Sequence, residues 1–153
     1  MNLEDCKSEV IERAFPEVRA VSIITRFHKM PDAYLEFTRL SRKRYLLDVN
    51  TSLKNAKRKV ILGGMGHEIA HISREISLGP VLSFFDAILY NRFPRYETRD
   101  ERRTDLLVIE RGLGPELLAF LKYANERRED YTAEDGLTVR EVESLLRQRA
   151  SNK

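Results

Sequence analysis

A helix that carries three glycines near its centre limits the ways in which this chain can fold. Its apolar residues recur at helical spacing and extend to about Ser77: Ala56, Val60, Met65, Ile69 and Ile72. Gly63, Gly64 and Gly66 lie inside this pattern, where each glycine costs about 1 kcal/mol relative to alanine. We therefore expect another element to approach the helix closely at the glycines. The pair Gly79–Pro80 is expected to end the helix.

Apolar periodicity predicts further helices on both sides of this one. The first covers residues 2–15 and is stopped by Pro16, because proline lacks the backbone N–H that a helix interior needs. The last begins at Thr138, since Thr138 and Glu141 have the spacing of a capping box. The others run from Pro80 to about Arg92, from Thr98 to Gly112 and from Pro115 to about Arg128.

Three short segments with alternating apolar residues predict strands. These residues are Val21, Ile23, Thr25 and Phe27 in the first segment, Leu35 and Phe37 in the second, and Tyr45, Leu47 and Val49 in the third. The first segment is rich in β-branched residues, which favours a mostly buried strand. We expect one domain over residues 1–153 of the α+β class, in which a small, mostly antiparallel sheet of about three strands packs against helices.

The composition excludes several classes of protein. A single cysteine, Cys6, can form neither an intramolecular disulfide nor a thiolate zinc cluster, and we expect it to be a small buried residue. The first residues are acidic and amphipathic, unlike a secretory signal, and no apolar run reaches the roughly 20 residues that span a bilayer. We therefore expect a soluble, cytoplasmic protein with no membrane partner. The net charge of +3 is a small excess that requires no acidic partner.

Residues 66–72, Gly-His-Glu-Ile-Ala-His-Ile, place the motif H-E-x-x-H on the glycine-containing helix. Residues four apart lie one turn apart on the same face, so His67 and His71 can bind one zinc ion through imidazole nitrogens. Glu68 projects to the side, where its carboxylate can take a proton from metal-bound water. In the alternative interpretation, the histidines bond to neighbouring groups and Glu68 is a solvated charge. The chain has only 3 histidines, so the motif rarely arises by chance.

A hydrolytic zinc site needs a third protein ligand and an open position for water. No histidine follows His71, and the remaining one, His28, lies on the first predicted strand. A carboxylate must therefore complete the site. The best-placed candidates are Glu97, Glu101 and Asp105, which are spaced by four residues along one face of the fourth predicted helix.

H-E-x-x-H followed by the stretch 101–105, E-R-R-T-D, resembles the motif pair of gluzincin metallopeptidases such as the HtpX and CAAX-prenyl-protease group. The resemblance implies a zincin-like fold reduced to a minimal soluble core. It implies that Glu101 is the third zinc ligand and that Asp105 hydrogen-bonds a ligand histidine. It covers only the two motif helices, and Thr104 replaces the alanine that is usual in the family.

Glu101 also has an interpretation that involves no metal. Thr98 and Glu101 have the spacing of a capping box, in which the glutamate binds the backbone at the start of the helix. In that case Asp105 or Glu97 becomes the candidate for the third ligand. The donor that stabilises an oxyanion also stays open, with candidates Tyr90, Tyr96, Tyr123 and His28. An extended substrate would pair with an edge strand, either at 35–38 or at 45–49.

We predict a zinc-dependent peptidase that hydrolyses peptide bonds in a peptide or protein through a metal-activated water, with Glu68 as general base. The alternative from another class is a nucleic-acid-binding protein, because basic residues gather over 39–44, 54–59 and 92–103. Acidic residues are interleaved with these runs, which favours a solvated surface. A third interpretation is an inactive scaffold whose degenerate site binds zinc without hydrolysis.

Overall fold

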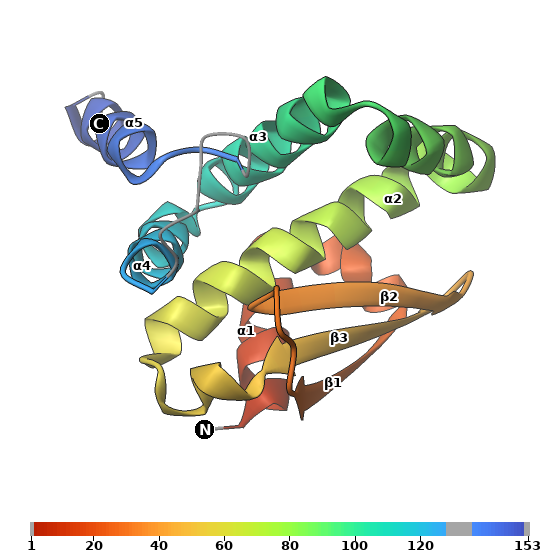
Figure 1. Ribbon diagram of the computed structural model, residues 1–153, viewed down its shortest axis with the longest axis horizontal. Coiled ribbons are helices and arrows are strands. Elements are labelled where there is room, and N and C mark those ends of the chain that lie inside the picture. Colours follow the sequence, from red (N-terminus) through yellow and green to blue (C-terminus); the bar gives the residue numbers. More distant parts are fainter. Residues whose placement is uncertain (1, 128–135, 152–153) are drawn as a thin grey trace.

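The computed structural model describes residues 2–127 and 136–151, and for residues 80, 81 and 83–91 it describes the backbone alone. It contains α-helices, a three-stranded sheet and two short 3-10 helices, which are labelled η (Figure 1). In chain order the elements are α1 (Leu3–Ala14), η1 (Pro16–Ala20), β1 (Ser22–His28), β2 (Leu35–Ser41), β3 (Arg44–Asn50), η2 (Thr51–Asn55), α2 (Arg58–Arg92), α3 (Pro94–Glu110), α4 (Gly114–Asn125) and α5 (Val139–Ser151).

The strands form a mixed sheet in the order β1-β3-β2. β3 pairs antiparallel with β2, where Phe37 lies opposite Leu47, and parallel with β1, where Ile23 lies opposite Tyr45. The prediction of a mostly antiparallel sheet is therefore wrong for one of the two strand pairs. The reason is burial: β3 buries Tyr45, Leu47 and Val49 and takes the centre, whereas β1 buries only Ile23 and lies at an edge. The prediction of a mostly buried first strand is wrong for the same reason.

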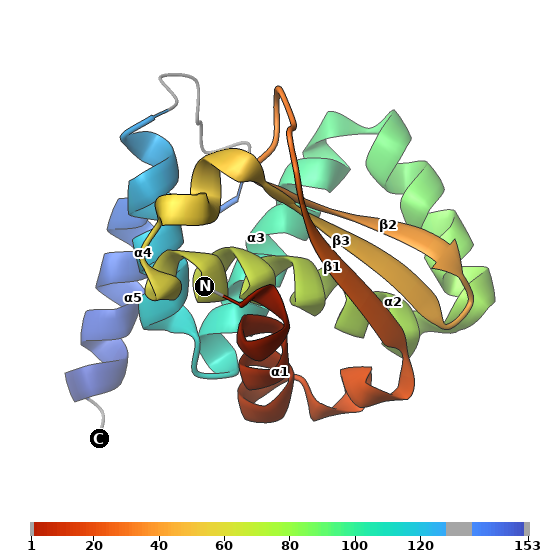
Figure 2. The same cartoon turned by 90° about the horizontal axis from the view of Figure 1, so that it is seen from below.

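Helix α2 separates two layers of the molecule. The sheet and α1 lie on one side of α2, and α3, α4 and α5 lie on the other (Figures 1 and 2). Buried side chains from both layers form one hydrophobic core; the largest fully buried ones include Tyr45, Phe15, Leu47, Ile61 and Met65. Within the described residues, no helix combines the length and the apolar composition that crossing a membrane requires.

The glycines of α2 lie where other elements approach it, as predicted. A Cβ added to Gly63 would lie 2.1 Å from the backbone carbonyl oxygen of Glu116 on α4. A Cβ added to Gly64 would lie 2.4 Å from Leu35 on β2. Both contacts are shorter than real Cβ contacts, so the absence of side chains lets α4 and β2 pack directly on the helix. The predicted break at Gly79 is confirmed, because its φ of 73° and ψ of 172° are not helical.

Two helix ends agree with the sequence analysis. α1 ends at Ala14, just before Pro16, and buries the apolar face that its periodicity predicts. At the start of α5, the backbone N–H of Thr138 donates to Glu141 over 2.8 Å, and the N–H of Glu141 donates to the Thr138 hydroxyl over 3.3 Å. This reciprocal pair is the predicted capping box.

Helix α3 begins at Pro94, earlier than the predicted start at Thr98. Proline is favoured in the first turn because the N–H that it lacks has no partner there. Thr98 therefore lies inside the helix, and its hydroxyl donates to the carbonyl oxygen of Pro94 over 3.1 Å. The capping box between Thr98 and Glu101 does not form, which leaves the Glu101 carboxylate available for other partners.

Candidate metal centre

Three side chains that the sequence predicts as metal ligands converge between α2 and α3. One ligand atom from each of His67, His71 and Glu101 lies within 4.8 Å of the others, so this ligand cluster can hold a metal ion. The Nε2 atoms of the two histidines are 3.1 Å apart. Glu101 places Oε2 2.9 Å from Nε2 of His67 and Oε1 3.4 Å from Nε2 of His71. The three side chains are 13–14% exposed, so solvent reaches a cluster that is otherwise enclosed.

The spacing of the two helices explains this convergence. His67 and His71 lie one turn apart on the face of α2 that meets α3, as H-E-x-x-H requires. α3 packs against α2 in the register that brings its residue 101 to the level of the histidines. Glu97, one turn earlier, is exposed and is absent from the ligand cluster found among the described residues. Asp105, one turn later, lies behind His67 instead of joining the ligands.

Asp105 orients His67. Its Oδ1 lies 2.8 Å from Nδ1 of His67, and its side chain is 1% exposed. An ionised carboxylate can only accept a hydrogen bond, so Nδ1 carries the proton and Nε2 is left to face the ligand cluster. The second oxygen, Oδ2, accepts the backbone N–H of Leu137 over 2.8 Å. Asp105 therefore takes the position expected of an outer partner that fixes a candidate ligand histidine.

His71 is supported by residues that the sequence analysis did not identify. Its Nδ1 lies 3.4 Å from the hydroxyl of Thr104 and 3.7 Å from a carboxylate oxygen of Asp100. Arg74 donates to the Thr104 hydroxyl over 3.0 Å and also forms an ion pair with Asp100. The ring of Phe37 on β2 stacks on the His71 ring with 6.0 Å between centroids. These contacts turn Nε2 of His71 toward the ligand cluster.

A sequence signal for these two supporting residues was present. Asp100 and Thr104 are one turn apart, and each immediately precedes one of the two acids of the predicted site. In the folded chain both side chains are buried, Asp100 with 5% and Thr104 with 0% exposed. Polar residues are rarely buried unless they have partners. Thr104 appeared only as a departure from the alanine of the gluzincin motif, whereas here its hydroxyl lies beside His71.

The charges of the cluster favour a cation at its centre. Burial opposes the protonation of His67, but the hydrogen bonds with Asp105 and Glu101 outweigh burial and raise its pKa well above the usual value. Burial likewise opposes ionisation of Glu101, but the hydrogen bonds with His67 and His71 hold the pKa of its carboxyl far below the usual range. Either a proton on Nε2 of His67 or a metal ion can balance the negative charge of Glu101, and the two compete for this nitrogen.

Glu68 lies beside the ligand cluster and is not part of it. Its side chain is partly buried, and burial raises the pKa of its carboxyl, while the positive charges of His67 and His71 oppose the rise. The negative charge of Glu36 on β2 also raises the pKa of Glu68. No side chain in the described part of the chain forms a hydrogen bond or an ion pair with this carboxylate. Glu68 is therefore an uncommitted base with increased proton affinity next to two histidines.

The structure separates the candidates for an oxyanion donor. His28 ends β1, an edge strand away from α3, and the hydroxyl of Tyr123 on α4 donates to the carbonyl oxygen of Ser52 over 3.3 Å. The side chain of Tyr90 lies outside the described residues. Tyr96 lies on α3, about one turn before Glu101. Among the candidates with a described side chain, Tyr96 is the one that shares an element with Glu101, the candidate third ligand.

Of the two segments considered for pairing with an extended substrate, only one is at an edge. Segment 45–49 belongs to β3, whose two sides pair with β1 and β2, so this prediction is wrong. Segment 35–38 belongs to β2, which lies at an edge. The inward side of β2 follows α2: Leu35 lies against Gly64, Phe37 stacks on His71, and Arg39 pairs with Glu75.

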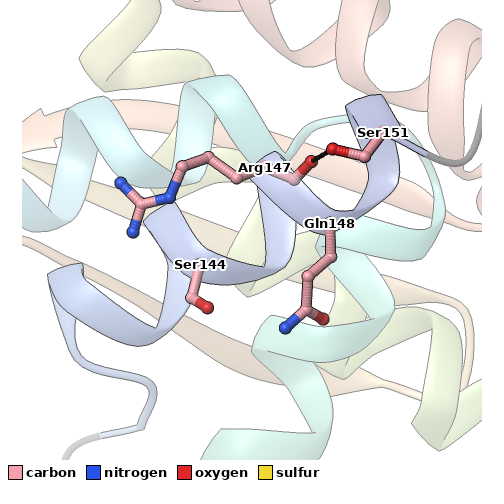
Figure 3. A pocket seen from close by; sticks show the side chains of 4 residues that line it. All are labelled: Ser144, Arg147, Gln148 and Ser151. Carbon is pink, nitrogen blue, oxygen red and sulfur yellow. Dashed lines mark hydrogen bonds between the residues drawn. The ribbon is translucent and has the colours of Figure 1, made fainter.

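A surface depression of about 430 Å³ lies on α5 (Figure 3). It is lined by Ser144, Arg147, Gln148 and Ser151. The Ser151 hydroxyl donates to the backbone carbonyl of Arg147 over 3.1 Å, so this polar group already has a partner. Among the residues that the structure describes, a single helix lines the depression and no acid or histidine is in its lining, so it offers no chemistry comparable with that of the ligand cluster.

Comparison with known proteins gives no match to a protein-family model, to a curated protein or to a solved structure.

Proposed function

We propose that this chain is a zinc-dependent peptidase with a zincin-like arrangement, in which His67, His71 and Glu101 bind the metal. One observation carries the proposal: two imidazole nitrogens and a carboxylate converge within 4.8 Å of one another, with an uncommitted glutamate beside them. The oxygen and nitrogen donors suit zinc, which takes three protein ligands in hydrolytic sites and leaves one position for water.

The spacing of the donor atoms supports zinc. Tetrahedral coordination with metal–ligand distances of about 2.0–2.1 Å places neighbouring donors about 3.3–3.4 Å apart. The imidazole nitrogens lie 3.1 Å apart, and the two carboxylate oxygens of Glu101 lie 2.9 Å from Nε2 of His67 and 3.4 Å from Nε2 of His71. Each separation is within about half an ångström of the tetrahedral spacing. Asp105 and Thr104 hold the rings from behind, which reduces the ordering cost of binding.

The residues of the chain divide the chemistry of peptide hydrolysis between them. Zinc, when bound, supplies a Lewis acid that polarises the scissile carbonyl and acidifies water. Glu68 accepts the proton of the attacking water, and burial favours this step because it raises the pKa of the carboxyl. The same carboxyl then gives the proton to the leaving amine. His67 and His71 would hold the metal through Nε2, since their Nδ1 atoms face Asp105 and Thr104.

An extended peptide fits the edge of the sheet next to this site. β2 pairs with β3 on one side, and its Phe37 stacks on the ligand His71. A substrate that added a strand to β2 would satisfy the edge backbone groups with main-chain hydrogen bonds, independently of side-chain identity. Its scissile bond would pass close to Glu68. We infer a peptide or unfolded protein segment as the substrate class.

The two alternative functions require features that differ from those of a peptidase. A nucleic-acid-binding protein needs free cations, whereas several residues of the basic runs are paired here: Arg39 with Glu75, Arg58 with Glu9, and Arg102 with Glu141. An inactive scaffold needs the ligand cluster but has no use for an uncommitted Glu68. No specific observation favours either alternative over the peptidase.

Zinc content provides the first test. Protein purified without a histidine tag is expected to contain about one zinc ion per chain, measured by plasma mass spectrometry after removal of loosely bound metal. His67→Ala is expected to lose that ion, because it removes one of three protein ligands and leaves Asp105 without its imidazole partner. His28→Ala is the matched control, since it removes a histidine that lies on β1 and should keep the metal.

Wild-type protein that contains no zinc and shows no saturable zinc binding would contradict the proposal. A nucleic-acid-binding protein would instead show an affinity for oligonucleotides that falls steeply with salt and does not depend on His67.

A further inference from the structure

We propose that the turn at Gly136–Leu137 positions the metal ligand His67 through Asp105, so that docking of residues 136–151 and metal binding stabilise each other. Residues 136–151, which contain α5, form the C-terminal arm. The inference rests on the metal site of the proposed function, but it does not require that the site hydrolyse peptides.

The carboxylate of Asp105 joins the arm to the ligand cluster. Its Oδ1 lies 2.8 Å from Nδ1 of His67, and its Oδ2 accepts the backbone N–H of Leu137 over 2.8 Å. With the arm docked, only 1% of the Asp105 side chain is exposed, so both partners are shielded from solvent. If the arm moves away, one oxygen of a buried carboxylate loses its donor, and the rotation of the carboxylate is no longer restrained. The position of the His67 ring then loses its restraint as well.

Gly136 is required for this contact. Its φ is +126°, a backbone conformation that residues with a Cβ rarely adopt. A Cβ built at this position would lie 2.5 Å from Oδ2 of Asp105 and 3.8 Å from Cβ of Glu101. Any side chain would therefore push the turn away from the carboxylate that it must reach.

A second set of contacts holds the arm on α3 one turn before Asp105. Arg102 donates to the carbonyl oxygen of Gly136 over 3.1 Å and forms an ion pair with Glu141 at 2.6 Å. Glu141 also forms the capping box with Thr138, so the Arg102 guanidinium binds the first turn of α5. These contacts lower the pKa of Glu141 to about 2, mainly through the Arg102 hydrogen bond.

Apolar contacts complete the docking of the arm. Val142 is 0% exposed, and Leu146 packs so closely on Gly114 of α4 that an added Cβ there would lie 2.6 Å away. Arg149 donates to the carbonyl oxygen of Ile109 at the end of α3 over 2.7 Å. The arm is therefore a docked element with its own contacts, and its first turn is the part that touches the ligand support.

Metal affinity of the whole chain tests the inference. Gly136→Ala is expected to weaken zinc binding about 10- to 100-fold, the range found for partners behind metal-ligating histidines. Affinity is measured by competition with a chromophoric chelator. Gly112→Ala is the matched control, because Gly112 also has a positive φ, +87°, but an added Cβ would have nothing within 4 Å. Gly112→Ala therefore tests the effect of an alanine at a positive φ, and only Gly136→Ala displaces the turn from Asp105.

Reciprocity gives a second measurement that ordinary destabilisation would not reproduce. If docking of the arm raises zinc affinity tenfold, zinc must favour docking by the same factor. Hydrogen exchange of the α5 amides in the wild type is therefore expected to slow up to about tenfold on addition of zinc. In Gly136→Ala this slowing is expected to disappear. If Gly136→Ala does not fold, Arg102→Met removes the hydrogen bond to Gly136 and the ion pair with Glu141 without changing Asp105. This variant is expected to show the same weaker zinc binding and the same loss of zinc-dependent slowing.

The outcomes separate this inference from the proposed function. Equal zinc affinity in folded Gly136→Ala and Gly112→Ala, or α5 exchange that zinc leaves unchanged in the wild type, would overturn the inference while the metal site stands. A wild-type chain that binds no zinc would overturn both.

Discussion

Glu68→Gln is expected to keep zinc at the wild-type stoichiometry and to lower the rate of peptide hydrolysis about 100- to 10,000-fold, the contribution typical of a positioned general base. Glutamine has nearly the same shape as glutamate but cannot accept the proton of the attacking water at neutral pH. The metal should remain because Glu68 is not among the ligand atoms that converge between α2 and α3. Turnover of a fluorescent peptide library, together with metal analysis of the same sample, measures both effects.

Glu97→Gln is the matched control for this variant. Glu97 is an exposed glutamate on α3, one turn from Glu101, and it was one of the two alternative third ligands in the sequence, with Asp105. Its replacement should change neither zinc content nor turnover. Hydrolysis by Glu68→Gln at the wild-type rate would rule out the proposed general base. A wild-type protein that binds zinc and cleaves no member of the library would instead identify the inactive scaffold.

Gly63→Ala is expected to lower the free energy of unfolding by about 3 kcal/mol or more, a large part of the roughly 5–15 kcal/mol that stabilises a typical domain. The added methyl group would lie 2.1 Å from the carbonyl oxygen of Glu116 and 2.6 Å from its carbon. Both atoms belong to the backbone of α4, so no side-chain rotation relieves the clash. Helix α4 must move away from α2, and the shared core must open. Urea denaturation followed by circular dichroism measures the loss.

Gly66→Ala controls for the helical preference of alanine. Gly66 lies on the same helix as Gly63, and at both positions alanine has a higher helix propensity than glycine by about 1 kcal/mol. Its added methyl group would meet Cδ1 of Leu113 at 3.1 Å, a flexible side-chain atom that can shift. We therefore expect nearly unchanged stability for Gly66→Ala. Equal stability of the two variants would contradict the close packing of α4 on α2.

The motif helix and its glycines were predictable because both are local properties. Periodicity places His67 and His71 on one face, and three glycines in a helix otherwise cost stability without benefit. The third ligand was less certain in the sequence, since Glu101 fitted both a metal ligand and a helix cap. The choice depended on where α3 begins, and Pro94 moves that start one turn before Thr98.

The strand order was predicted only in part, and several residues that support the site were not predicted. The order β1-β3-β2 depends on which strand buries most apolar area against α1 and α2, and a strand pattern does not state its neighbours. Asp100 and Thr104 gained their roles only when α3 lay against α2 and brought them to the far side of the His71 ring. Leu137 supplies a backbone N–H to Asp105, a contribution that no residue type reveals.

Local sequence alone places two imidazoles one turn apart beside a glutamate, marks where another element must approach, and caps the last helix, because these features depend on backbone spacing over a few residues. Everything that joins distant segments required the folded chain: the acid that completes the ligand cluster, the groups behind each histidine, the central strand and the contact of the C-terminal arm. Such pairings depend on how the apolar faces of several elements share one core, and that competition is settled only when all of them pack together.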